Sequence, residues 1–351
     1  MKKLLITMLS LAVAAIASAA DSPDIVWQVP NPNILSNSVL AVGWSPASDV
    51  VAVGSTDRWF RARRVVDGVE SYAVLEPPKT SGVGQIFFST DGGLIGVQNR
   101  SSTMSFIVQR ASDGVTLGRM IATVGQDGLV SFAPDSQLQS SAGGDGTLSR
   151  WRFSDVTLFR AIGSGYDRVV TVFNFSPDGT FQTAASGGRI TIQRRSDAAI
   201  VQVLSGGSVI TFSDDSALFA AWSSTPSNEI ALWRTSDWGF LRSLPSTATN
   251  EGVVGLRFTP DGQAIVSTGY LPYVDQDGLW QQKGIIRFWR ISDGAVLTTY
   301  DSQTDIGVTA RIAWSPDGSL FAYGLYNGTA AVARTPMLTV FDHPQRRIRL
   351  D

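Results

Sequence analysis

Apolar and polar residues alternate in short runs along most of the chain, and tight-turn sequences separate the runs. The segment Ile285–Trp289 (IIRFW) is one example, and its length and two-residue period are typical of a β-strand. Turn phrases of the type Ser-Pro-Asp-Gly follow aromatic residues, and proline, aspartate and glycine each favour a tight reversal of the chain. We therefore expect an all-β protein built from short antiparallel strands.

The turn phrase is part of a long repeat. Its seven copies begin at Ser45, Ser89, Ala133, Ser176, Ser213, Thr259 and Ser315. A second turn signal follows each copy, an arginine that in most copies opens the phrase Arg-x-Ser-Asp, at Arg64, Arg110, Arg152, Arg194, Arg234, Arg290 and Arg334. A spacing of about 44 residues with four short strands is typical of a β-propeller blade. The pattern predicts one seven-bladed β-propeller of four-stranded antiparallel blades over residues 21–345.

The repeat resembles the WD-repeat β-propeller family in its bacterial form. The segment Gly144–Trp151 (GDGTLSRW), together with the turn phrase, carries the resemblance over nearly the whole chain. The sequence departs from the family at two points. Arginines such as Arg152 and Arg234 stand where the family has aspartate after tryptophan, and the Gly-His pair is missing because His343 is the only histidine. The resemblance implies a propeller that binds partners, but without the buried His–Asp tetrad that the family can build.

Two segments could supply the outer strand of the last blade. In the family, the first and last segments commonly share a blade, and Ser22–Val29 has suitable strand composition. Met337–Phe341 could supply the same strand locally. We favour the N-terminal segment, with the inner strands running through Ala313, Ala322 and Val332.

The first twenty residues have the pattern of a cleaved signal peptide. Lys2 and Lys3 precede an apolar run over 4–16 and a small-residue site, Ala17-Ser-Ala19. The run is shorter than the ~20 residues of a spanning helix, which disfavours an uncleaved anchor. We expect export to the periplasm or the extracellular space and no membrane span. The C-terminal tail, residues 346–351, is expected to be a solvated end.

Few residues suggest chemistry. The chain has no cysteine and one histidine, so a nucleophilic triad or a transition-metal site is not expected. The formal charge of −2 gives no electrostatic reason to bind nucleic acid. The repeated arginine is expected at the end of the third strand, where it could bond turn carbonyls or an aspartate such as the one three residues later; a ring of anion-binding arginines is the alternative. We expect no enzymatic activity, no metal and no cofactor.

One departure from the repeat indicates a binding site. The sixth copy carries about a dozen extra residues between its second and third strands. The candidate ligand- or partner-binding residues there are Tyr270, Tyr273, Asp275, Asp277 and Trp280. Aromatic side chains give rigid contact area at low entropic cost. The insert could instead be a lid on a neighbouring blade, and its Asp-x-Asp-Gly resembles the start of a calcium loop without the distal glutamate.

The sequence thus predicts an exported, non-catalytic propeller scaffold that acts as a monomer. It would bind a protein or peptide partner through its loop face. A glycan-binding propeller is the main alternative, and a propeller hydrolase is a weaker one because fold does not determine function.

Overall fold

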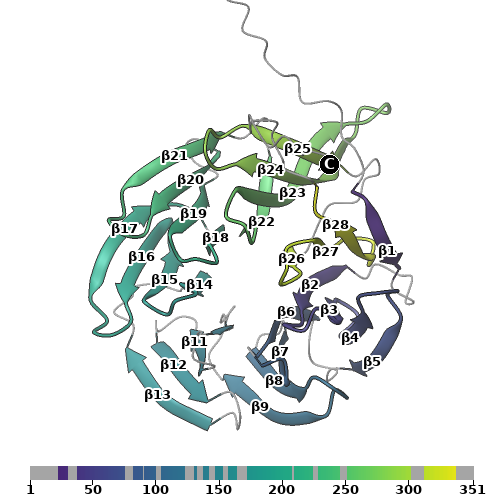
Figure 1. Cartoon of the computed structure of the whole chain (residues 1–351), viewed down its shortest axis with the longest axis horizontal. Coiled ribbons are helices and arrows are strands. Elements are labelled where there is room, and N and C mark those ends of the chain that lie inside the picture. The colour runs from purple at the N-terminus through teal and green to yellow at the C-terminus, as the bar shows by residue number, and fades with distance from the viewer. Residues whose placement is uncertain are drawn as a thin grey trace, which may run out of the picture.

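The computed structural model describes residues 23–30, 38–75, 82–89, 91–99, 104–122, 130–132, 137–141, 147–152, 157–163, 172–207, 209–223, 228–245, 251–301 and 312–336. Within these ranges, 28 strands form seven four-stranded antiparallel sheets. The sheets are arranged around a common axis, each with one edge toward the centre and the other on the rim (Figure 1). The chain is therefore a β-propeller with four-stranded blades. The predicted signal peptide and C-terminal tail lie outside the described residues.

Six blades are made of four consecutive strands, and they are numbered here in chain order. Blade 1 is β2–β5 (Val39–Trp44, Val50–Ser55, Trp59–Arg64, Glu70–Leu75) and blade 2 is β6–β9 (Val83–Phe88, Leu94–Asn99, Met104–Arg110, Thr116–Ala122). Blade 3 is β10–β13 (Val130–Phe132, Gln137–Ser141, Thr147–Arg152, Thr157–Gly163) and blade 4 is β14–β17 (Val172–Phe175, Phe181–Ser186, Arg189–Arg194, Ile200–Ser205). Blade 5 is β18–β21 (Val209–Phe212, Leu218–Ser223, Glu229–Arg234, Phe240–Pro245) and blade 6 is β22–β25 (Gly252–Phe258, Ala264–Val274, Trp280–Arg290, Val296–Asp301).

The remaining sheet joins the two ends of the chain, and we call it the closing sheet. It contains β26 (Ala313–Trp314), β27 (Leu320–Gly324) and β28 (Ala330–Arg334), with β1 (Ile25–Val29) paired to β28 as the outer strand. The prediction of a seven-bladed β-propeller is therefore wrong. Six copies form complete blades, and the last copy supplies only three strands. The prediction that the N-terminal segment provides the outer strand is confirmed, whereas 337–341 lies outside the described residues.

In the described turns that follow the inner strands, a buried hydroxyl holds the turn. In blade 4, the Ser176 hydroxyl donates to Asp178 at 2.6 Å and accepts the backbone N–H of Phe181 at 2.8 Å. Gly179 has a φ of 75°, the left-handed conformation that lets the strand reverse. The same hydroxyl–aspartate bond recurs at Ser89, Ser213, Thr259 and Ser315. The repeat phrase thus forms local hydrogen bonds that fix where the second strand of these sheets begins.

Hydrophobic side chains from neighbouring sheets meet between them and form the core. Between blades 5 and 6, buried residues such as Leu232 and Leu244 pack with Phe258 and Trp289. Between blade 6 and the closing sheet, Phe288 lies 6.1 Å from Phe321 between ring centroids. Among the described side chains, these sheets thus bury their faces against their neighbours, as stacked repeats do.

A rim contact closes the ring between β1 and blade 1. Trp27 is 8% exposed, and its Nε1–H donates to the carbonyl of Val65 at 2.7 Å. Gly68 lies against the indole, and a Cβ there would come within 2.8 Å of the Trp27 ring. Tyr72 of blade 1 makes the equivalent bond to Ala111 of blade 2 at 2.8 Å. An aromatic residue of one outer strand therefore fastens the outer turn of the next blade.

Candidate functional site

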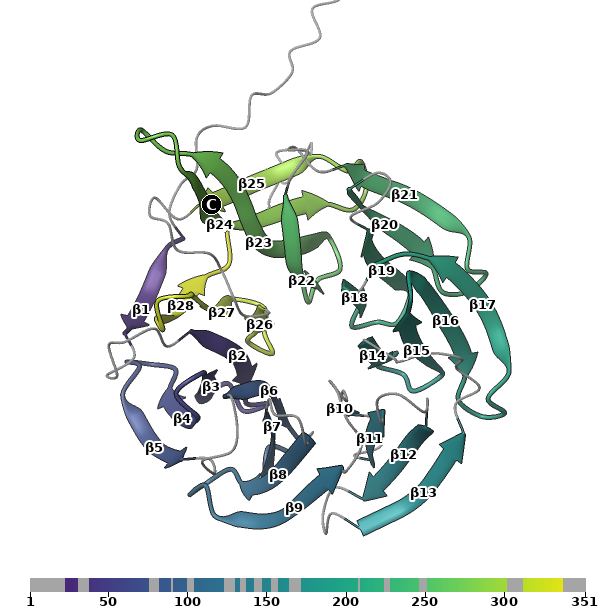
Figure 2. The same cartoon turned by 180° about the vertical axis from the view of Figure 1, so that it is seen from behind.

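The feature that distinguishes blade 6 is a long hairpin that rises from its second and third strands. Strands β23 and β24 each have 11 residues and pair continuously from Ala264↔Arg290 to Val274↔Trp280. Their inner neighbour β22 ends its pairing at Gly252↔Tyr270, and β25 ends at Ile285↔Asp301. The part beyond, residues 271–283, is thus a two-stranded ribbon, which we call the arm. Figures 1 and 2 show it extending outside the ring.

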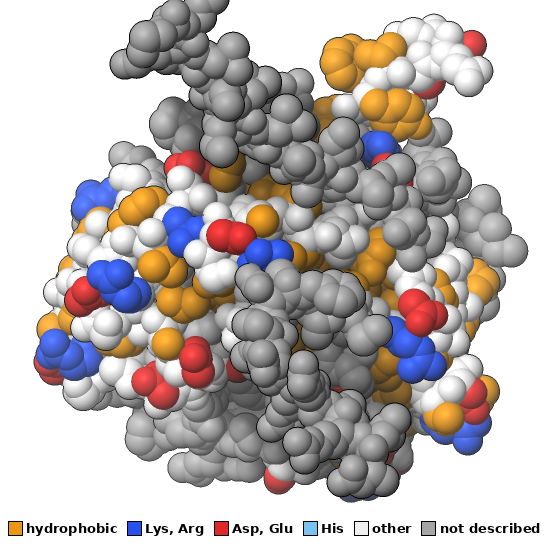
Figure 3. All heavy atoms as spheres, turned by 45° about the horizontal axis from the view of Figure 1, so that its top comes forward, with side chains coloured by type: hydrophobic (Ala, Val, Ile, Leu, Met, Phe, Trp, Pro, Cys, Tyr) orange, Lys and Arg blue, Asp and Glu red, His pale blue; other side chains and the backbone are white. Residues whose placement is uncertain are grey.

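The tip of the arm carries three apolar side chains in solvent. Trp280 is 71% exposed, Leu279 60% and Val274 52%. Val274 and Trp280 are direct cross-strand partners, so their side chains share one face of the ribbon. Figure 3 shows hydrophobic side chains on the arm where it stands clear of the body. This exposure does not fit the predicted lid, because the tip of a lid would pack on a neighbouring blade.

The aspartates of the arm have different roles. Asp275 closes the turn: its carboxylate accepts the N–H groups of Asp277 at 3.0 Å and Leu279 at 2.8 Å, and the Gln281 amide at 2.9 Å. The Gln281 bond, together with these N–H bonds, lowers the pKa of Asp275. Asp277 is exposed at the end of the turn. Asp275 is therefore a turn residue, and Asp277 is the acidic group that the arm presents.

The two tyrosines lie nearer the body. Tyr270 packs over Gly252, where a Cβ would come within 2.3 Å of its ring, and Tyr273 is partly exposed on the arm. The structure therefore brings Tyr273, Asp275, Asp277 and Trp280 together on the arm and places Tyr270 at its base. Sequence reasoning missed Val274 and Leu279. Their position beside an Asp-x-Asp-Gly turn in an insert was the available signal.

The repeated arginine is structural, as expected. Arg110, Arg194, Arg234 and Arg290 end third strands and bind the aspartate three residues later at 2.7–2.9 Å, and Arg64 binds Asp67 in the same way. Most of these side chains are about half exposed, so solvent screens the pairs and each contributes little to stability. Because a carboxylate neutralises each of these arginines, the ring of anion-binding arginines is not supported.

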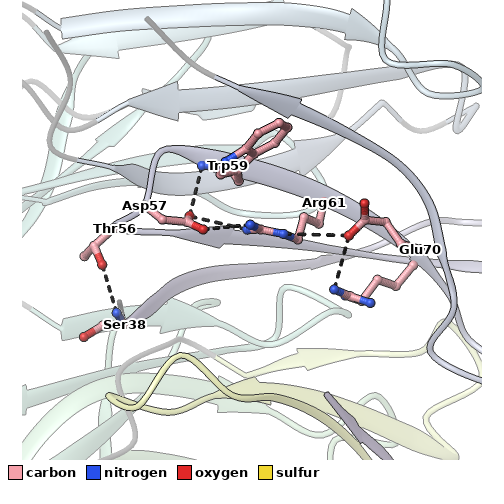
Figure 4. Close-up of polar contacts among 7 residues, drawn as sticks. Ser38, Thr56, Asp57, Trp59, Arg61 and Glu70 are labelled. Atoms are coloured by element: carbon pink, nitrogen blue, oxygen red, sulfur yellow. Dashed lines mark hydrogen bonds and ion pairs between the residues drawn. The ribbon is translucent and has the colours of Figure 1, made fainter. Parts of the chain in front are cut away.

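Blade 1 contains a cluster of charged side chains that is more buried than the arginine–aspartate pairs of the outer turns. Arg61 binds Asp57 at 2.7 Å, and both side chains are at most 6% exposed. Glu70 lies 3.7 Å from Arg61 and 3.3 Å from Arg63, and Asp57 also accepts the N–H of Trp59 (Figure 4). Every charge in the cluster has an opposite partner, so we assign it to fixing the turn between β3 and β4.

Comparison with known proteins finds no protein-family model that matches the chain and no match among the curated proteins. Among the described residues, no group of three or more histidine, cysteine, aspartate or glutamate side chains is placed to hold a metal ion. The described segments also include no helix long and apolar enough to cross a membrane. The function is therefore inferred from the propeller and its arm.

Proposed function

We propose that this chain is an exported, non-catalytic scaffold of the WD-repeat type that binds a protein partner through the arm. The propeller fold in general suggests a protein-binding scaffold. The repeat phrase supports the WD-repeat relationship, and the pattern of residues 1–20 supports export. The observation that carries the proposal is the exposed apolar tip, Val274, Leu279 and Trp280.

Exposure of these apolar side chains to water is thermodynamically unfavourable unless another molecule covers them. A two-stranded ribbon without a third strand is only marginally stable in water, yet this one carries the most exposed aromatic side chain among the described hydrophobic residues. Tryptophan side chains dominate the binding energy of many interfaces when a pocket on the partner desolvates them. A partner with an apolar pocket would bury Trp280, and a basic group at the rim of that pocket would complement Asp277.

The test is affinity capture from the native envelope with the mature protein as bait. Trp280→Ala should lose the captured partner, whereas Tyr326→Ala, which removes another exposed aromatic side chain (46% exposed), should retain it. Both variants should unfold at the wild-type temperature, because neither side chain is in the core. Equal recovery of every partner by both variants would refute the role of the arm. Loss of binding to a glycan array in the Trp280 variant would favour the glycan-binding alternative.

A further inference from the structure

The inner strand of blade 6 carries a charged side chain where the other inner strands have none. Arg257 is the penultimate residue of β22 and is exposed, whereas its neighbours Leu256 and Phe258 are buried. The penultimate residues of the other inner strands are all uncharged: Gly43, Phe87, Ser131, Asn174, Thr211 and Ala313. Arg257 is therefore a departure from the repeat at a place where the fold itself requires no charge.

Arg257 faces solvent at the inner edge of the ring. Strand β22 pairs with β23 along one edge, and its other edge lies toward the common axis (Figures 1 and 2). Leu256 and Phe258 pack in the core between blades 5 and 6. Because consecutive residues of a strand point to opposite faces, and because Arg257 is exposed, its side chain does not enter this core.

This part of β22 lies far from the arm. Arg257 pairs with Val266 near the start of β23, whereas Gly252 at the other end of β22 pairs with Tyr270 at the base of the arm. The five residues between Gly252 and Arg257 span ~17 Å at ~3.4 Å per residue. Arg257 is therefore at the end of the ring where the turn phrases lie, opposite to the end from which the arm rises.

A second departure from the repeat lies beside Arg257 in blade 5. Asp214 follows Ser213 in the turn after β18, and its side chain is exposed. The other turn phrases have an uncharged residue at this place: Pro46, Thr90, Pro134, Pro177, Pro260 and Pro316. Strands β18 and β22 pack against each other and both run toward their turn phrases, so Asp214 and Arg257 lie at the same end of the ring.

The two charges interact without forming a pair. Burial raises the pKa of Asp214 and lowers that of Arg257, and the charge of each group partly opposes the shift of the other. Within the described ranges, neither side chain forms an ion pair or a hydrogen bond. Solvent reaches both groups although burial affects their pKa values, which is typical of charges in a concave part of a surface. One positive and one negative group thus remain available to a molecule that enters from solvent.

We propose that Arg257 and Asp214 bind a free amino acid by its zwitterionic head, the guanidinium donating to the carboxylate and Asp214 accepting from the ammonium group. The planar N–H fork of arginine matches the geometry of a carboxylate. A ligand with only a negative charge would be repelled by Asp214, and one with only a positive charge by Arg257. The site does not depend on the arm or on the partner proposed for it.

The site is tested by titrating the mature protein with L-alanine, N-acetyl-L-alanine and L-alanine amide, which carry both charges, only the negative charge and only the positive charge. Ligand-observed saturation-transfer NMR measures the binding. L-Alanine should bind saturably with a dissociation constant on the order of millimolar, and each blocked derivative should bind about tenfold more weakly or worse. This comparison uses the wild-type protein and does not require any variant to fold.

Arg257→Gln and Asp214→Asn should each weaken alanine binding about tenfold and should unfold at the wild-type temperature. The matched controls are Arg194→Gln in an outer turn and Asp277→Asn in the arm, which remove the same charges and should bind alanine like wild type. Equal alanine binding by Arg257→Gln and wild type, equally tight binding of either blocked derivative, or no saturable binding would each overturn the proposal. Trp280→Ala should keep alanine binding while losing the partner, so that failure of this site and failure of the arm give different results.

Discussion

The rim contact of Trp27 gives the sharpest test of how the ring is closed. Trp27 is 8% exposed, bonds to Val65 across the junction and packs on Gly68. Removing a buried tryptophan side chain costs about 3–5 kcal/mol of unfolding free energy. Trp27→Phe keeps most of the packing but leaves the Val65 carbonyl without its donor, which costs about 1–3 kcal/mol. Trp27→Ala should therefore be the less stable of the two variants.

The measurement is equilibrium unfolding of the mature protein in urea, followed by tryptophan fluorescence and circular dichroism. All variants are fitted with one value for the dependence of the unfolding free energy on urea concentration. Val66→Ala is the matched control, because Val66 is 79% exposed in the same outer turn and should change stability by no more than about 0.5 kcal/mol. If Trp27→Ala lies within about 1 kcal/mol of wild type, β1 does not close the ring and the pairing of β1 with β28 is wrong.

Three further predictions concern the turns and the charges. Ser315 is 2% exposed and donates to Asp317 at 2.6 Å, so Ser315→Ala should lower the unfolding free energy by about 1–3 kcal/mol in urea; an unchanged midpoint would contradict the role of the hydroxyl in the turn. The Ser315 bond is the largest cause of the lowered pKa of Asp317. The stabilisation that the ionised Asp317 gives the folded state is therefore fully present above pH 3.8, the pKa in the unfolded chain. It is lost as the pH falls through the lower pKa of the folded state. The difference in unfolding free energy between Ser315→Ala and wild type should therefore become smaller in acid. Arg287→Met should cost about 3–5 kcal/mol because it removes the guanidinium that pairs with the buried Glu251 carboxylate, and adding Glu251→Gln should restore part of that loss. Arg194→Ala breaks an exposed pair and should leave the midpoint of urea unfolding close to that of wild type; a clearly lower midpoint would mean that the outer-turn pairs are structural supports.

Much of the blade architecture could be predicted from the sequence because it depends on local chemistry. The hydroxyl at Ser176, the aspartate at Asp178 and the glycine at Gly179 set their turn within one short segment. The Arg-x-Ser-Asp phrase likewise forms its ion pair within four residues, as at Arg194. The outer strand from the N-terminus was also predicted, because its composition suits a strand and the ends of such chains commonly share a blade.

The remaining features depend on which residues meet between blades. Nothing near Trp27 in the sequence indicates that its partner is the carbonyl of Val65. Glu229 begins β20 of blade 5 and Glu251 directly precedes β22 of blade 6, and the sequence gives no reason to expect both at one small pocket. The prediction of a seven-bladed ring was wrong because every copy of the turn phrase was counted as a blade, whereas the last copy contributes three strands to the closing sheet.

The candidate site was predicted in part. The length of the insert and its aromatic residues indicated a surface in the sixth copy, and the arm is there. The sequence could not show whether Trp280 packs on the body or projects from it, because the outcome depends on β22 and β25 ending their pairing before the arm begins. Asp275 resembled a ligand-binding residue but forms the turn.

The central claim, that the tip of the arm contacts a protein partner, is tested most directly by site-specific photocrosslinking in the native cell. A photoreactive amino acid replaces Leu279 in the arm or, as a control of similar exposure, Val66 in an outer turn (60% and 79% exposed). We expect a discrete crosslinked protein for position 279 that is absent for position 66. The same crosslinked species from both positions, or none from position 279, would contradict it.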